Sequence, residues 1–171
     1  MIKATDLAYG RLGAPDLDRM EEFLVNFGMV RADRTKKALY MRGTDGDHHH
    51  IHVTELGEPT HIGLAWWVGS EEDLEIISKA PGASEIHEID EPGGGKRVNL
   101  TDPDGRIIEV IHGMETVDDL DVRDVAINTG NDKYKRTEIQ RLSMNPGQPS
   151  QVKRSAHAVV KTADLDRKSV V

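Results

Sequence analysis

The stretch YGRLGAPDLDR, residues 9–19, decides the fold, because the similar stretch HAVVKTADLDR returns at residues 157–167. In both copies an apolar strand leads through a turn into an acidic helix start. Self-similarity of this kind indicates repeated structural units. Only four residues follow the second copy, so the sequence predicts one complete unit and the opening strand of another.

Composition and charge exclude several classes of protein. Hydrophobic residues make up 37% and charged residues 30% of the 171 residues, which is typical of a globular domain. The net charge of -8 argues against nucleic acid as a partner. With no membrane-length apolar run and no recognisable signal peptide, we expect no membrane partner. The absence of cysteine excludes disulfides and thiolate sites and agrees with a cytoplasmic location.

The first third of the chain is predicted to form a strand, a helix and three strands. A strand over residues 7–12 leads to Pro15 and Asp16, which begin a helix that ends at Gly28. The apolar positions expected on its buried face recur at helical spacing and are Leu17, Met20, Phe23, Leu24 and Phe27. The strands that follow are predicted at residues 29–33, 38–42 and 49–56.

The same pattern restarts after Gly57. A strand over residues 62–68 precedes a helix that Ser70 caps. The apolar positions expected on the buried face of this helix are Leu74, Ile76, Ile77 and Ala80. Three strands follow at residues 84–89, 97–101 and 106–112, and a DPDG turn joins the last two. We therefore predict an α+β domain over residues 1–112, built from βαβββ modules at about 1–57 and 58–112, with the helices on one face of a mixed sheet.

Beyond this domain the periodicity fails. Residues 113–154 are predicted to be a linker with one short strand at 124–128, and residues 155–171 the first strand of a second domain. The later part of the linker is basic and includes Lys153 and Arg154. Two interpretations stay open, a tail that lies against the acidic first domain and a solvated linker.

Glu109 is the first candidate for a functional residue. Its strand, residues 107–111, is apolar on both faces, so the carboxylate is expected to be buried. An unpaired buried carboxylate costs several kcal/mol, so Glu109 needs a partner, a metal or a water-filled pocket. The competing structural interpretation is a bond to a neighbouring arginine or tyrosine.

The histidines are the other candidates. His61 has Gly63 and Ala65 as neighbours on the same face of its strand, which leaves room for a ligand but also suits a tight strand crossing. Within HHHIH, residues 48–52, strand alternation places His50 and His52 on one face. This pair could form a surface metal site, and a histidine cluster at the sheet rim without a metal is the competing interpretation.

Together these features resemble the vicinal-oxygen-chelate superfamily, which includes glyoxalase I, bleomycin-resistance proteins and type I extradiol ring-cleaving dioxygenases. The segments that carry the resemblance are RLGAPDLDR, GDHHHIHV, DPDGRIIEV and the linker YKRTEIQR with GQPSQVKRSAHAVVKTADLDR. The dioxygenases are the most similar members, because in them a two-module N-terminal domain precedes a two-module catalytic domain. The resemblance implies the glyoxalase/extradiol dioxygenase fold.

The resemblance also implies a metal. In those dioxygenases two histidines and one glutamate of the C-terminal domain hold Fe(II), sometimes Mn(II), and leave positions open for the catecholate and O2. By position, His157 matches the first ligand, and the other two would lie beyond Val171. In the N-terminal domain the equivalent positions are Tyr9, His61 and Glu109. Tyr9 departs from the pattern, so this trio is expected to be a vestige whose members can hydrogen-bond to one another.

The expected function is therefore that of a truncated extradiol dioxygenase of aromatic compound catabolism. The intact protein would cleave an aromatic diol, whereas this chain alone, with one of three iron ligands, is expected to be inactive and to bind no metal. An exposed strand over residues 157–162 predicts a homo-oligomer, most simply a dimer. The alternatives are a small-molecule binding protein of the bleomycin-resistance type and a glyoxalase-like metalloenzyme centred on His61 and Glu109.

Overall fold

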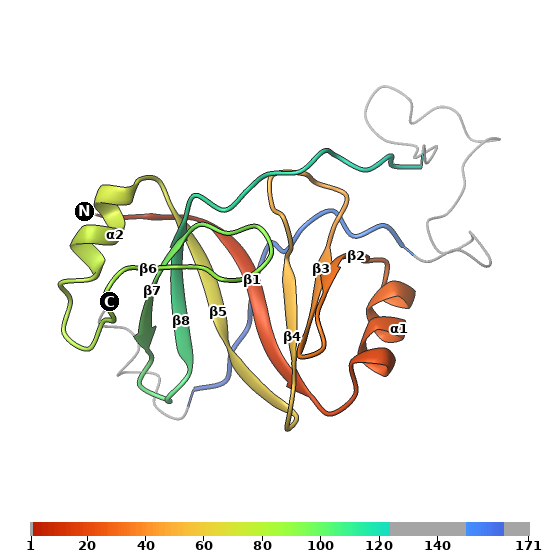
Figure 1. Cartoon of the computed structure of the whole chain (residues 1–171), viewed down its shortest axis with the longest axis horizontal. Helices are drawn as coiled ribbons and strands as arrows, with labels where there is room; N and C mark the ends of the chain where they lie inside the picture. Colours follow the sequence, from red (N-terminus) through yellow and green to blue (C-terminus); the bar gives the residue numbers. More distant parts are fainter. Residues whose placement is uncertain (1, 124–149, 163–171) are drawn as a thin grey trace, which may run out of the picture.

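The computed structural model describes residues 2–123 and 150–162. Within these ranges the chain forms strand, helix and three strands twice over (Figure 1). In chain order the elements are β1 (Ala4–Ala14), α1 (Leu17–Phe27), β2 (Val30–Arg34), β3 (Ala38–Arg42), β4 (His52–Leu56), β5 (Thr60–Val68), α2 (Glu71–Ile77), β6 (His87–Glu88), β7 (Lys96–Thr101) and β8 (Ile107–His112). The two predicted βαβββ modules are therefore present.

All the strands join one eight-stranded sheet in the order β2-β3-β4-β1-β5-β8-β7-β6. Each module pairs its first strand with its last in parallel, β1 with β4 and β5 with β8. The antiparallel pair β1 and β5 joins the modules in the middle of the sheet. This mixed sheet with two helices confirms the predicted fold class.

The helix caps follow the sequence prediction. Asp16 caps α1 by accepting hydrogen bonds from the amides of Asp18 and Arg19. Gly28 ends α1 with a φ of 108°, a left-handed conformation that glycine adopts without a steric cost. Ser70 caps α2 by accepting from the amide of Asp73.

The predicted buried face of each helix is partly wrong. In α1 the buried residues are Leu17, Glu21 and Leu24, while Phe23 and Phe27 are 60% and 57% exposed. Glu21 is buried because Arg31 and Arg34 pair with its carboxylate, which an apolar pattern cannot indicate.

In α2 the buried side chain is Leu74. Ile76 is 56% exposed, and Ala80 lies beyond the end of the helix at Ile77. The helix is shorter than the apolar pattern indicates, and Ile77, in its last turn, is partly buried and packs against the same core cluster as Leu74.

Three predicted strands also differ from the structure. The strand expected at 49–56 begins only at His52, because a loop occupies the preceding residues. The strand expected at 84–89 is reduced to β6, His87–Glu88. Residues 157–162 carry no strand in the described part of the tail, and the strand expected at 124–128 lies outside the described residues.

The core is divided between the two faces of the sheet. We call the face without helices the concave face; its cluster consists of Ala8, Tyr9, Ala38, Tyr40, Val53, Ala65, Ile89, Ile111 and Met114. On the helix face α1 covers Leu39 and Met41, and α2 covers Val98 and Val110. The concave face is therefore filled by packed side chains.

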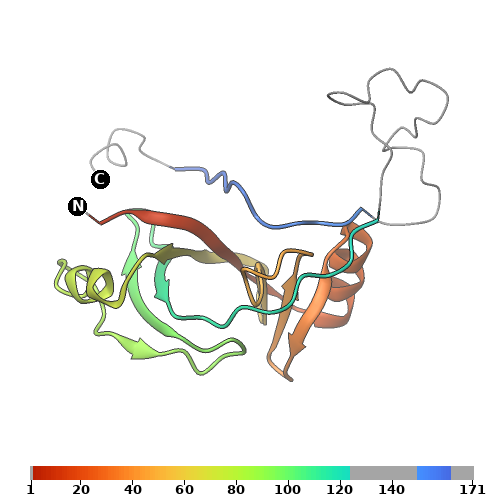
Figure 2. The same cartoon turned by 90° about the horizontal axis from the view of Figure 1, so that it is seen from above.

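Two segments beyond β8 cross the domain on opposite faces (Figure 2). Residues 113–123 leave β8 along the concave face, where the amides of Glu115 and Val117 donate to the carbonyls of Gly93 and Gly46. Residues 150–162 cross the other side, where the amide of Val152 donates to the carbonyl of Gly28.

Residues 150–162, called the tail, lie against the first module. Of the two interpretations left open by the sequence, this agrees with the one in which the basic end of the linker, Lys153 and Arg154, lies against the domain. The amide of Thr44 donates to the carbonyl of Val152, and Arg154 lies 3.4 Å from Asp6. Among the described residues, no helix combines the length and the apolar character needed to cross a membrane.

Candidate functional site

Three neighbouring strands bring the first two site residues together. Tyr9 on β1 pairs in register with Ala65 on β5, which pairs in turn with Glu109 on β8. Paired residues point to the same face of a sheet, so all three lie on the concave face. The small side chain of Ala65 leaves Tyr9 free to reach across β5, and its hydroxyl donates a short hydrogen bond to Oε2 of Glu109.

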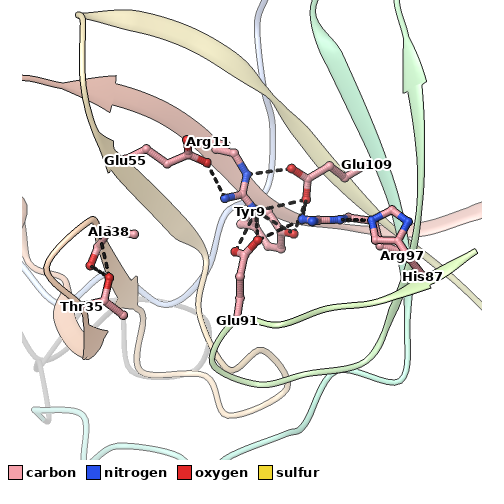
Figure 3. Close-up of polar contacts among 9 residues, drawn as sticks. All are labelled: Tyr9, Arg11, Thr35, Ala38, Glu55, His87, Glu91, Arg97 and Glu109. Atoms are coloured by element: carbon pink, nitrogen blue, oxygen red, sulfur yellow. Dashed lines mark hydrogen bonds and ion pairs between the residues drawn. The ribbon is translucent and has the colours of Figure 1, made fainter. Parts of the chain in front are cut away.

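Arg11 lies two residues after Tyr9 on β1 and therefore on the same face. Its guanidinium contacts three carboxylates in three directions (Figure 3). Nε donates to Oε1 of Glu109 at 2.7 Å, Nη1 to Glu55 at 2.8 Å and Nη2 to Glu91 at 2.9 Å. Arg11 is nevertheless only 5% exposed, so this cation is held in the interior by its partners.

A second arginine completes the group. Arg97 on β7 donates from Nη1 to Glu109 at 3.0 Å and to Glu91 at 3.1 Å. Its Nε donates to Nε2 of His87 at 3.2 Å. We call the residues of this group the ionic cluster: Tyr9, Arg11, Glu55, Glu91, Arg97 and Glu109. Three members come from each module, so the cluster joins the two halves of the domain.

The charges of the cluster fix its protonation state. Burial alone would raise the pKa of Glu109, but the charges of Arg11 and Arg97 and the hydrogen bonds from Arg11 and Tyr9 hold this pKa below its ordinary value. Burial and the neighbouring Glu109 carboxylate raise the pKa of Tyr9. At neutral pH Glu109 is therefore an anion, Tyr9 a neutral hydrogen-bond donor and Arg11 a cation.

His61 does not join Tyr9 and Glu109, contrary to the expected trio. A register shift between Arg11 and Leu12 pairs His61 with Leu12. His61 instead lines an apolar cavity of about 220 Å³ together with Leu64 and Trp66. Gly63 serves a tight strand crossing, because a Cβ atom there would lie 2.0 Å from the carbonyl oxygen of Ile107.

The residues at the family's metal positions do not fit a divalent ion. Both oxygens of Glu109 already accept hydrogen bonds, Oε1 from Arg11 and Oε2 from Tyr9 and Arg97. Across residues 2–123 and 150–162, no three His, Cys, Asp or Glu side chains form a group that could hold a metal. A metal ion here would have to compete with two fixed guanidinium charges.

His50 and His52 are buried, so the predicted surface cluster of these two histidines is wrong in its placement. His50 precedes β4 and is 1% exposed, with its ring 4.8 Å from that of Tyr9 on the concave face. His52 is paired with Met41, which packs under α1 on the helix face, and it contacts Thr54 at 2.8 Å. Strand alternation does not relate the two histidines because the strand starts between them.

His157, which matches the family's first ligand, lies in the tail. It is exposed and outside any strand. Its position along the chain agrees with the resemblance, and its role as a ligand stays a prediction.

Glu109→Gln should lower the free energy of unfolding by about 1–3 kcal/mol, because the amide keeps the shape but loses the charge that both arginines face. Urea denaturation of the variant and the wild type measures this loss. His61→Gln is the matched control, since His61 lies outside the cluster and this substitution should cost less than about 0.5 kcal/mol.

Added Fe(II) should leave the wild-type melting temperature unchanged. A rise in wild type that Glu109→Gln abolishes would show a working metal site instead.

Comparison with solved structures finds the same fold in a glyoxalase and in ring-cleaving dioxygenases. The Mn(II)-bound glyoxalase from Novosphingobium aromaticivorans has a TM-score of 0.65 at 22% identity, covering 72% of this chain and 44% of that one. The homoprotocatechuate 2,3-dioxygenase from Brevibacterium fuscum, in complex with 3,4-dihydroxyphenylacetate, has a TM-score of 0.58 at 23% identity, covering 68% and 40%. The 2,3-dioxygenase LapB from Pseudomonas sp. KL28 has a TM-score of 0.61 at 19% identity, covering 69% and 44%.

These similarities establish the glyoxalase/extradiol dioxygenase fold, as the sequence predicts. The chain spans only 40–44% of the length of these three structures. No protein-family model matches the sequence, and no curated protein matches it either.

Proposed function

We propose that this chain contains the N-terminal domain of an extradiol ring-cleaving dioxygenase and that this domain does not bind the metal of the enzyme. The ionic cluster carries this proposal. It lies where the resemblance places Tyr9 and Glu109, and its arginines neutralise the carboxylates that a metal would need. The fold of the neighbours and the share of their length that this chain covers support the same assignment.

The metal and the substrate of the intact enzyme are part of this proposal. Iron(II) or manganese(II) is the proposed metal and an aromatic diol the proposed substrate, as in the neighbour that binds 3,4-dihydroxyphenylacetate. The metal ligands would belong to a second domain, to which His157 contributes the first. A cytoplasmic location and a homodimer remain predictions from the sequence.

The two alternative functions fit the described residues less well. A binding protein of the bleomycin-resistance type would use the concave face, but Tyr40, Ile89 and Met114 are packed into it. A glyoxalase-like metalloenzyme centred on His61 and Glu109 would need these two side chains together. His61 lines a separate apolar cavity, whereas Glu109 is bonded to Arg11.

The purified chain should not cleave catechols. We expect no yellow ring-opened product when the protein is incubated with Fe(II), O2 and a panel that includes catechol and 3,4-dihydroxyphenylacetate, because the ionic cluster offers no open metal position. Visible absorbance follows the reaction, and Fe(II) without protein is the control. Turnover clearly above this control would contradict the proposal.

A further inference from the structure

We propose that the guanidinium of Arg11 takes the place of a bound metal cation on the concave face and excludes a divalent ion from it. Three carboxylates from three separate segments converge on its guanidinium, as carboxylates converge on a bound cation. This inference rests on the contacts of Arg11 alone and stands whether or not the chain belongs to a dioxygenase.

The arrangement of the three carboxylates around Arg11 is the first argument. Glu55 comes from β4, Glu91 from the loop between β6 and β7, and Glu109 from β8. Each faces a different nitrogen of the guanidinium, at 2.7–2.9 Å. The planar guanidinium provides fixed donor directions, so its contacts select this one arrangement of the carboxylates.

The charge balance is the second argument. With both arginines present, the three carboxylates leave the cluster with one net negative charge. Without Arg11 the cluster would carry two net negative charges, and Arg97 would be the one remaining arginine paired with Glu91 and Glu109. The guanidinium is permanently charged, so the position stays occupied at every pH at which the protein is folded.

Free cations offer a direct test, because a cavity left by Arg11→Ala should accept a small cation from solution. The variant should melt below the wild type, and millimolar guanidinium chloride should raise its melting temperature by several degrees relative to sodium chloride of equal ionic strength. Manganese(II) chloride should act in the same direction. The wild type should respond to neither probe, since its own guanidinium fills the position.

Arg34→Ala is the matched control. Arg34 also bridges two carboxylates, those of Asp18 and Glu21, but at a more exposed site where water replaces the lost charge. The melting temperature of the Arg34→Ala variant should not respond to guanidinium chloride. An Arg11→Ala protein that melts like wild type, or that responds to neither cation, would overturn the inference.

A second pair of variants covers the case in which Arg11→Ala does not fold. Arg11→Lys keeps the charge and Arg11→Met keeps only the apolar part of the side chain. The lysine variant should melt well above the methionine variant, or fold where the latter does not. If the two behave alike, including a shared failure to fold, the cationic charge is not what the position requires and the inference is wrong.

Discussion

Arg11→Met is expected to lower the free energy of unfolding by about 3–5 kcal/mol, the typical cost of removing one partner from a buried ion pair. The methionine fills most of the volume of the side chain, so the loss reports the charge and its hydrogen bonds. Glu109, which is 3% exposed, keeps Arg97 but loses its contact with Arg11 at 2.7 Å. Since small domains are stable by only about 5–15 kcal/mol, this change alone could leave the protein marginally folded.

Urea denaturation followed by tryptophan fluorescence measures this loss. Arg31→Met is the matched control, because Arg31 also pairs with a glutamate but is 56% exposed, and such pairs contribute only about 0–1 kcal/mol. Adding Glu109→Gln to Arg11→Met should restore part of the stability, since the second change reduces the net charge of the cluster from two negative charges to one. A double variant less stable than Arg11→Met would show that packing, not charge, explains the loss.

Acidification from pH 7 to pH 5 is expected to lower the stability by about 4 kcal/mol, through two buried histidines. Burial lowers the pKa of His50 to about 3 and that of His52 to about 4. In the unfolded chain both titrate near 6.5. Between these values the unfolded state binds more protons, so stability falls as the pH drops through 6.5 towards 4. By pH 5 each histidine has therefore lowered the free energy of unfolding by about 2 kcal/mol.

The free energy of unfolding at pH 7, 6 and 5 checks this window. The double variant His50→Phe, His52→Gln cannot titrate at these positions and should show little change over the same range. Glu109 adds a separate loss only below its ordinary pKa of about 4.5, because its folded pKa is depressed. Equal wild-type stability at pH 7 and pH 5 would contradict this account.

The order of elements could be predicted because its signals are local. Asp16, Ser70 and Gly28 mark helix ends within one turn of the chain, and apolar periodicity marks the segments between them. The wrong predictions of which side chains are buried arise where a charged residue far away in the sequence pairs with the side chain. Glu21 faces inward because β2 supplies Arg31 and Arg34, and no pattern within α1 indicates this.

The ionic cluster could be predicted only in part. The strand of Glu109 shows that its carboxylate is buried and needs a partner, and the structure gives it both a tyrosine and arginines. Arg11 shares a face with Tyr9 by simple alternation, a signal that could have indicated it. Glu91 had no such signal, because it lies in a glycine-rich loop without periodicity.

The contact between Arg11 and Glu109 joins residues 98 positions apart in the chain. Contacts of such long range slow folding, because the entropy of closing a large loop is lost before the contact forms. During synthesis Arg11 must therefore stay in water until nearly the whole domain has emerged from the ribosome. Its burial reports that β1 and β8 have reached their final places on either side of β5, so the ionic cluster is expected to be among the last parts of the domain to become native.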